Sequence, residues 1–493
     1  MKNFTYILAT VLLSVVPFSC SKFLEEVDQD KFIPSAVDHF AALLLREFNY
    51  NPGIYSIFQM MTDEVSEVES RSIASADGDE RANMRPIYTW QRNIELRADG
   101  RLANNNNPAW QRLYRQIAIA NYVLEEIDEA EGSVEEIAFT KGEAYFIRAY
   151  CYFYLTNLYA EPYEDAEQAR VTYGVPLRTG IGVVSTYDKN MLNECYELIE
   201  DDLAQARTLI DSSGLTKSLY HTSVKVCDLL LSTIKLYKKE YQETIDAATK
   251  VIANSVLMRI VVGTEDRPFI TTNNPEVLYS FSQVDGSLGT SYMRARSLVV
   301  NPQLINSYHD DDLRKTCFFS PERDISTQEI RVYPRKGNSG YTNLGICNMR
   351  VAEAYLNRAE AYAFTNQYDK AREDLRTLLS RRYSNAGSIE IPSDNAQLVA
   401  FIFRERFKEF CFEIHHRWFD LRRMGASLRP DIVHRFSITD RDGVLHGTET
   451  YTLLKNDRNY TLSVPWQERD NNPFIRDYER FDKSPEYRGE IIF

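Results

Sequence analysis

Beyond its first 18 residues the sequence has no apolar run that approaches the length of a membrane-spanning helix. It also has no cluster of lysines and arginines larger than short pairs, and its formal net charge is -14. A nucleic acid is a polyanion, so a chain of this charge would repel it in the absence of a strong basic patch. The composition therefore argues against nucleic-acid binding.

Metal-binding patterns are missing as well. The zinc-protease arrangement H-E-x-x-H does not occur. Glu413, His415 and His416 are candidate ligands, but adjacent residues on a helix point about 100° apart, so the two histidines would not converge on one ion. The acidic run Asp77–Glu80 lacks the ligand register of an EF-hand loop, so we interpret it as a solvated loop. We predict no metal and no cofactor, with calcium left unsupported.

The seven cysteines follow no zinc spacing. A disulfide bridge between Cys317 and Cys347 is left open by the sequence. The following cysteines lie at helix positions that we expect to be buried as free thiols: Cys151, Cys195, Cys227 and Cys411.

What the chain does contain is a large apolar fraction, 44%, together with 31 tyrosines and 25 phenylalanines. A chain of 493 residues with this composition can bury a large core, as one large helical domain or two smaller ones. Tyrosine combines a flat apolar face with a polar tip, so it suits polar ring-shaped ligands as well as cores.

The N-terminus has the pattern of a targeting segment. Lys2 precedes a short apolar run, residues 6–18, and Ser19-Cys20 follows it, which resembles a bacterial lipobox. We predict a lipoprotein signal peptide over residues 1–19, a lipidated Cys20 that begins a tether over residues 20–34, and one domain over residues 35–493. Ordinary secretory cleavage with an unmodified Cys20 is the alternative.

Apolar residues at helical spacing predict a mainly α fold. The amphipathic 405–425 stretch is expected to form one helix, with Glu405, Glu409 and Glu413 on one flank, neutralised by nearby Arg and Lys, and Gly425 as its end. Other helices are expected near residues 35–48, 108–127, 143–159, 192–210, 223–239 and 241–252.

Two helical hairpins repeat one pattern. Tyr241 is followed by apolar residues at +7, +10 and +11, and Tyr368 is followed by the same spacing. This resembles degenerate tetratricopeptide-type helix pairs, which must stack on one another to bury their faces. Two stretches have little helical periodicity: residues 50–107, before the second expected helix, and residues 255–347, between the two hairpins. We expect the ligand contacts in these two stretches. Short strands are expected at 274–281, 451–454 and 460–464.

Several of these segments together resemble the SusD/RagB family of outer-membrane nutrient-binding lipoproteins. The resemblance covers nearly the whole chain, and His415 stands where the family usually has Gly. The motifs that carry it are Glu405-Arg-Phe-Lys-Glu409, Phe412-Glu413, His416-Arg-Trp-Phe-Asp-Leu-Arg-Arg-Met-Gly425, Met349 to Tyr362, Gly142 to Leu155, Trp110-Gln-Arg-Leu-Tyr114, Asn274-Pro-Glu-Val277 and Asp312-Leu-Arg314.

The resemblance implies tetratricopeptide-like hairpins forming an α/α superhelix, with irregular loops and a few short strands. It implies a lipid-anchored protein on the cell surface that lies over a TonB-dependent SusC-like barrel transporter in the outer membrane. The expected activity is capture of an oligosaccharide or polysaccharide, or of a peptide in some relatives, and its delivery to the transporter, without catalysis. These motifs lie on the scaffold, so they identify the family and not the ligand.

A glycan presents apolar C–H faces and many hydroxyls, so its site needs an exposed aromatic face beside hydrogen-bonding groups. Within the irregular stretches, Tyr88 and Trp90 with Arg92 form one such set, and Tyr292 with Arg294 forms another. Trp90 as a core residue is the competing interpretation. Two other functions stay open: an all-helical glycoside hydrolase, which needs two carboxylates about 5–10 Å apart, and a protein-binding scaffold lipoprotein.

Overall fold

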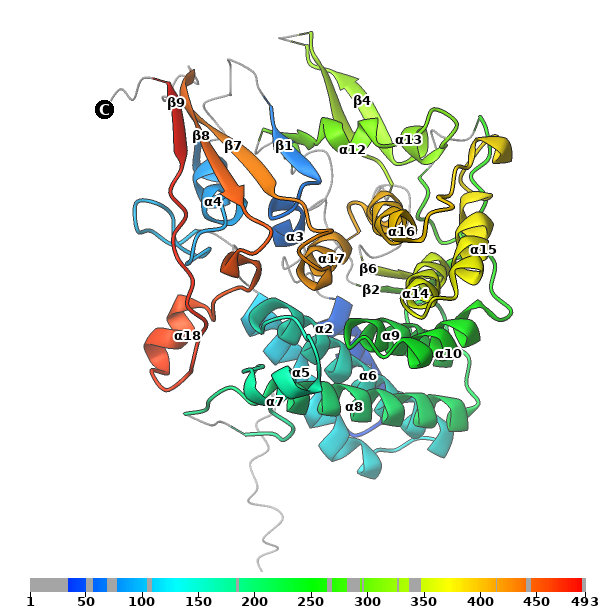
Figure 1. The fold of residues 1–493 in the computed structure, drawn as a ribbon. Coiled ribbons are helices and arrows are strands. Elements are labelled where there is room, and N and C mark those ends of the chain that lie inside the picture. Colours follow the sequence, from blue (N-terminus) through cyan, green and yellow to red (C-terminus); the bar gives the residue numbers. More distant parts are fainter. Residues whose placement is uncertain are drawn as a thin grey trace, which may run out of the picture.

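In the computed structural model the helices dominate, as the sequence predicts, and the strands are short (Figure 1). The signal segment, Cys20 and all but the last residue of the predicted tether lie outside the described residues, so the boundaries at residues 19 and 34 stay predictions. No helix in the described part of the chain is long and apolar enough to cross a membrane. The structure describes residues 34–49, 56–68, 78–103, 109–182, 186–263, 268–281, 293–294, 297–325, 328–336, 347–413, 415–439 and 445–489.

The long helices pack pairwise into a curved array that occupies the lower and right-hand parts of Figure 1. Helix α6 lies at its centre, between α5 and α8, and is therefore buried on nearly all sides along its C-terminal two thirds. The scaffold helices are α2 (Val37–Asn49), α5 (Ala109–Glu126), α6 (Val134–Tyr159), α8 (Leu192–Ser213), α9 (Val224–Tyr237), α10 (Tyr241–Ile252), α14 (Val351–Phe364), α15 (Tyr368–Leu379), α16 (Asn395–Phe410) and α17 (His416–Arg423).

The predicted repeat of two hairpins is present in the backbone. Helices α10 and α15 begin at Tyr241 and Tyr368 and have the same length, 12 residues. The turn before each contains one left-handed residue, Lys239 with φ 62° and Asn366 with φ 59°. The N–H of each of these residues donates to the carbonyl three residues earlier. The α9–α10 and α14–α15 pairs are thus two copies of one helical hairpin, and α10 packs against α14.

The stretch from Glu405 to Gly425 is not one helix, so that prediction is wrong. Helix α16 ends at Phe410, Phe412 is left-handed with φ 59°, and α17 begins at His416. The N–H of Phe412 donates to the Glu64 carboxylate at 2.5 Å, which holds the break against a distant segment. The rings of His415 and His416 stack in the core with centroids 4.3 Å apart, and burial lowers the pKa of His415 to about 3.

Most of the remaining elements lie above the helical array in Figure 1 or on its left side, whereas β2 and β6 lie beside α14 and α7 lies against α8. The strands form pairs β1–β3, β2–β6 and β4–β5 and a three-stranded sheet β7–β8–β9, all antiparallel. The strands are β1 (Val65–Glu67), β2 (Val277–Phe281), β3 (Leu298–Val300), β4 (Phe319–Arg323), β5 (Ile330–Pro334), β6 (Cys347–Arg350), β7 (Ile432–Thr439), β8 (Leu445–Leu453) and β9 (Glu486–Gly489). The short helices are α3 (Ser56–Met60), α4 (Gly78–Tyr88), α7 (Ala166–Val171), α12 (Pro302–Asn306), α13 (Arg314–Cys317) and α18 (Trp466–Asn471).

The sequence expectations for strands and cysteines are confirmed in part. The strand expected at 274–281 is present as β2 over residues 277–281, and β8 includes residues 451–453 of the strand expected at 451–454. Residues 460–464 form no strand, and the β7–β8–β9 sheet occupies a region that the sequence presents as mostly loop. Cys317 is buried and is not part of a disulfide, so it forms no bridge with Cys347. The four cysteines expected at helix positions are buried free thiols, although Cys411 lies one residue beyond the end of α16: Cys151, Cys195, Cys227 and Cys411.

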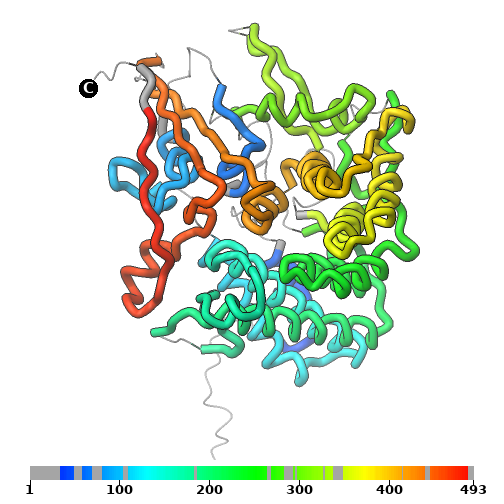
Figure 2. The backbone as a smooth tube through the Cα atoms, in the orientation of Figure 1, coloured from blue at the N-terminus to red at the C-terminus, as the bar shows by residue number. Residues whose placement is uncertain are grey.

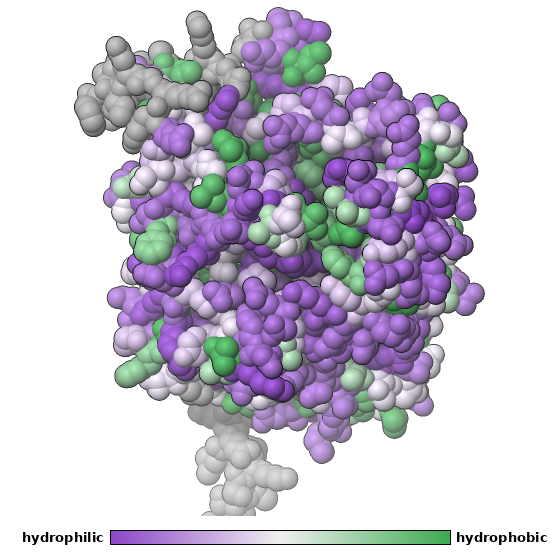
Figure 3. Space-filling model, in the orientation of Figure 1, coloured by the Kyte–Doolittle hydropathy of each residue, from purple (hydrophilic) through white to green (hydrophobic). Residues whose placement is uncertain are grey.

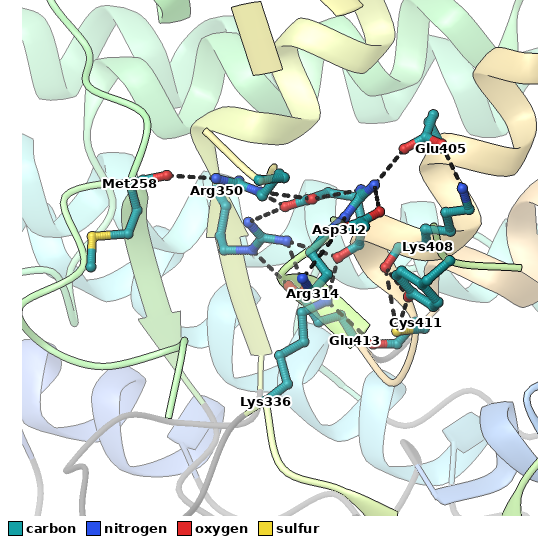
Figure 4. Close-up of polar contacts among 12 residues, drawn as sticks. Met258, Asp312, Arg314, Lys336, Arg350, Glu405, Lys408, Cys411 and Glu413 are labelled. Atoms are coloured by element: carbon teal, nitrogen blue, oxygen red, sulfur yellow. Dashed lines mark hydrogen bonds and ion pairs between the residues drawn. The ribbon is translucent and has the colours of Figure 1, made fainter. Parts of the chain in front are cut away.

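The core contains a dense network of buried charges that joins the irregular insertion to the helices (Figure 4). Its centre is the Glu409 carboxylate on α16, which is fully buried. Arg314 of α13, Arg350 of β6 and Arg382 after α15 approach it at 3.2, 3.1 and 2.9 Å. These three guanidinium groups hold the pKa of Glu409 far below its ordinary value, despite the opposing effect of burial.

The network extends outward so that each carboxylate has a cation. Glu276 before β2 accepts from Arg350 and from Arg382, both at 2.8 Å. Glu405 accepts from Arg314 at 2.6 Å, and Asp312 accepts from the same guanidinium at 2.7 Å. The partners of the predicted acidic flank therefore come mainly from other segments, namely the insertion, β6 and the end of α15, and Lys408 of α16 adds one local partner for Glu405.

Replacing Glu409 by Gln should destabilise the fold by about 3–5 kcal/mol, because three buried arginines lose a shared counter-charge. The low folded pKa means that the unfolded chain binds more protons in acid, so wild-type stability is present above about pH 4.5 and falls as the pH drops below it. The Glu409→Gln variant should show a shallower acid dependence. Urea unfolding between pH 3 and pH 7 measures both effects.

The matched control is Glu479→Gln, which breaks an ion pair with Arg458 in which both side chains are about two-thirds exposed. Such a pair contributes only about 0–1 kcal/mol. Equal losses for the two variants would contradict the role given to Glu409.

Candidate functional site

A large pocket opens where β1, β3 and β7 meet α12 and β5. Its volume is about 870 Å³, which is within the range of small-molecule sites. In Figure 2 the orange β7 lies beside the blue β1, although more than 350 residues separate them in the chain. We call this the β1–β3–β7 pocket. It is lined by residues 66–68, 299–303, 305–306 and 329–332 and by Tyr88, Val433 and Arg435.

The pocket wall follows from the alternation of side chains along the strands. Ser66 pairs with Val299 across β1 and β3, and both are partly exposed, whereas their neighbours along each strand are buried. On β7, Val433 and Arg435 are exposed and the residues between and beside them are buried. One face of these short strands thus packs on the core and the other faces the pocket.

Glu67 is the buried acid of the pocket, and it is held as a structural anchor. Its carboxylate pairs with Arg81 and accepts hydrogen bonds from the N–H and the hydroxyl of Ser437, at 2.6 and 2.7 Å. Burial raises the pKa of Glu67, while the Arg81 guanidinium opposes that shift. These contacts fasten β1 to β7 and leave the acid engaged in internal bonds.

Helix α12 supplies the polar edge of the pocket. Asn301 caps it by accepting from the Gln303 N–H at 2.9 Å, and its amide donates to the carbonyl of Asp63 at 3.0 Å. The side chains of Gln303 and Asn306 are exposed and have no hydrogen-bond partner in the described part of the chain. Their amides offer both donors and acceptors to a ligand.

Two predicted ligand contacts lie in the core. Tyr88 and Trp90 stack on the two faces of the His434 ring, with centroids 4.1 and 4.3 Å away. Both are 1% exposed or less, and the Trp90 indole N–H donates to the carbonyl of Met61 at 2.9 Å. Tyr88 contributes to the pocket wall, but neither ring presents a face to solvent. The expectation of a surface platform at this pair is therefore corrected: the rings secure β7 to the end of α4 and to the segment that follows it.

The other predicted contacts are dispersed. Arg92 is exposed, and its backbone N–H donates to Asp482 at 3.1 Å. Arg294 is exposed, pairs with Glu322 and lies 5.2 Å from the centre of the Tyr333 ring. Tyr292 lies outside the described residues. Neither arginine lines the β1–β3–β7 pocket.

Aromatic side chains in the two irregular stretches are mainly core residues. Every aromatic residue of 50–107 and 255–347 that the structure describes is buried. Sequence reasoning also missed Val433 and Arg435 of β7, because no local pattern indicates that this strand meets β1. The alternation in Ile432 to Ser437 is the signal that could have indicated a half-buried strand.

Two family profiles match the chain. One, described as starch-binding and associating with the outer membrane, covers residues 22–236, and the other, of the SusD family, covers residues 300–476. Together they span most of the sequence. The chain belongs to the SusD/RagB family. A search of curated proteins finds no match.

Solved structures of SusD-like proteins share the fold over nearly their full length. A SusD superfamily protein from Bacteroides thetaiotaomicron is 21% identical, with a TM-score of 0.67 over 90% of this chain and 100% of its own. A SusD-like carbohydrate binding protein from Bacteroides vulgatus is 19% identical, with a TM-score of 0.65 over 90% and 97%. A SusD superfamily protein from the same species is 18% identical, with a TM-score of 0.69 over 92% and 100%.

Replacing Trp90 by Ala should lower the free energy of unfolding by about 3–5 kcal/mol, because a buried indole and its stack on His434 are lost. Arg92→Ala, two residues away and exposed, should change it by no more than about 0.5 kcal/mol. Guanidinium unfolding of both variants measures the difference. A Trp90→Ala chain as stable as the wild type would contradict the core placement.

Proposed function

We propose that this protein is a cell-surface lipoprotein that binds glycans at the β1–β3–β7 pocket and passes them to a TonB-dependent outer-membrane transporter. The observation that carries the proposal is a wide pocket of mixed lining in a chain of the SusD/RagB family. The family profile is described as starch-binding, and one solved neighbour is described as a carbohydrate binding protein. The ligand is thus an oligosaccharide or polysaccharide.

The lining suits a saccharide chemically. Val299, Ile330 and Val433 provide apolar surface against C–H faces, and Ile330 and Val433 are 63% and 55% exposed. Gln303 and Asn306 provide amides for hydroxyl groups. The face drawn in Figure 3 is mainly hydrophilic, with apolar patches scattered over it.

Binding without hydrolysis is the activity that the lining favours. A glycoside hydrolase needs two carboxylates, one of which donates or accepts a proton and one of which attacks or activates water. Of the acids that line the pocket, Glu67 is engaged by Arg81 and Ser437, and Glu329 lies near Arg331 at 3.9 Å. The two acids are thus not arranged as a catalytic pair, and the lining supports glycan binding better than it supports glycoside hydrolysis. The protein-binding scaffold alternative has no observation in its favour.

Calorimetric titration of the soluble protein from residue 21 against a panel of neutral polysaccharides tests the proposal. Gln303→Ala and Asn306→Ala should each raise the Kd of the bound glycan about threefold to tenfold, because each removes a hydrogen bond to a hydroxyl. Gln397→Ala, an exposed amide at the start of α16, is the matched control and should leave the Kd unchanged. Binding to no glycan, or release of shortened sugars, would overturn the proposal.

The anchor and the transporter are tested separately. Cys20→Ser should move the protein from the membrane fraction to the soluble fraction, because the acyl chains are lost. Mass spectrometry of the wild-type N-terminus should find fatty acids on Cys20, and purification from solubilised membranes should retain a barrel transporter. A mature wild-type chain with an unmodified Cys20 would contradict the lipid anchor.

A further inference from the structure

A second hollow lies on another part of the molecule, between α5, the segment before α8 and α18. It has two chambers of about 330 and 370 Å³ that share Trp110, Gln111 and Glu468. We call it the α5–α18 groove. It has no lining residue in common with the β1–β3–β7 pocket, and Figure 1 places α18 at the lower left, α5 in the lower middle and β1 near the top.

Aromatic rings line this groove and are partly accessible. Tyr114 and Tyr187 are partly exposed in one chamber, and Trp466 is partly exposed in the other. Trp110 lies between the chambers, with its ring centre 4.9 Å from that of Tyr114. Flat apolar faces of this kind suit the C–H face of a sugar ring. The β1–β3–β7 pocket, by contrast, has one aromatic lining residue, the buried Tyr88.

The walls are held in place by internal hydrogen bonds. The Tyr187 hydroxyl donates to Glu468, which joins the segment before α8 to α18. The Tyr114 hydroxyl donates to the carbonyl of Pro176 at 2.7 Å, and the Asn121 amide donates to the carbonyl of Arg178 at 3.0 Å. The groove is therefore preorganised, so little ordering is required when a ligand enters.

Two polar groups of the groove lack partners in the described part of the chain. The indole N–H of Trp466 is buried and has no acceptor. The Gln111 side chain is exposed, and no hydrogen bond involves it. The Gln111 amide is accessible and can both donate to and accept from ligand hydroxyls.

The charges of the lining favour a neutral ligand. Glu468 and Asp470 are acidic, and Arg178 is the single basic residue of the two chambers. A phosphorylated or uronic-acid ligand would meet net negative charge, and a purely apolar ligand would bury the Glu468 carboxylate without benefit. Each chamber is at the lower end of the size of known small-molecule sites, which corresponds to one or two sugar rings.

We propose that the α5–α18 groove is a second binding site for a neutral saccharide, separate from the β1–β3–β7 pocket. The ligand class rests on the proposed function. Two sites on one rigid chain engage two segments of the same polymer, so a long glycan binds more tightly than a short one of the same linkage.

Fluorine NMR of protein labelled with 5-fluorotryptophan tests this proposal. The chain has four tryptophans, and Trp90, Trp110 and Trp418 are 2% exposed or less, so Trp466 provides the accessible probe. Its resonance is assigned by its loss in Trp466→Phe. Titrants are maltohexaose, cellohexaose, xylohexaose and mannohexaose, with oligogalacturonate as the anionic control.

The neutral hexasaccharide that binds in calorimetry should shift the Trp466 resonance in a saturable way, and oligogalacturonate should not. Gln111→Ala should raise the Kd from this resonance about threefold to tenfold, through the loss of one hydrogen bond. Gln303→Ala, in the other pocket, should leave that Kd unchanged.

The outcomes separate the two proposals. A hexasaccharide that binds in calorimetry without moving the Trp466 resonance would overturn the second site and leave the proposed function standing. A Trp466 shift weakened by Gln303→Ala and not by Gln111→Ala would also overturn it, because the resonance would then report the first pocket. Binding of none of the four hexasaccharides would reject both.

Discussion

The Glu409 carboxylate and its three arginines are the interaction on which the rest of the fold depends. Arg314 comes from the insertion, Arg350 from the strand before α14, and Arg382 from the end of the second hairpin. Buried charges of this kind are costly unless every one is paired, so they tolerate one arrangement of the segments and penalise others. The network therefore fixes where the insertion lies on the helices, and through it the position of β3, α12 and β5 at the pocket.

A rigid helical array that carries irregular segments is well suited to binding. The β1–β3–β7 pocket is built from segments that lie before the two hairpins in the chain (β1), between them (β3, α12 and β5) and after them (β7). Glu67 and His434 fasten β7 to the earlier segments through buried contacts. The α5–α18 groove uses the scaffold itself, since α5 forms one of its walls. The loops can therefore change in sequence without disturbing the frame of helices and buried charges.

Much of the scaffold could be predicted from sequence, because helical periodicity is local. The ranges 223–239 and 241–252 correspond closely to α9 and α10, and the spacing after Tyr241 and Tyr368 identified the repeated hairpin. The site could not be predicted in the same way. Trp90 was one aromatic residue in a polar stretch, and its burial depends on His434, which is 344 residues away on a strand with a weak pattern.

The sequence by itself determined the mainly α class and the paired helices, because the spacing of apolar residues depends on neighbours within a few turns of one helix. Its motifs carried the resemblance to the SusD/RagB family. Tertiary structure alone decided the break at Phe412, the cations that neutralise Glu409 and the surfaces that stay open to a ligand. The physical reason is that burial and charge pairing are properties of segments brought together from distant parts of the chain, and no local pattern records which segments meet.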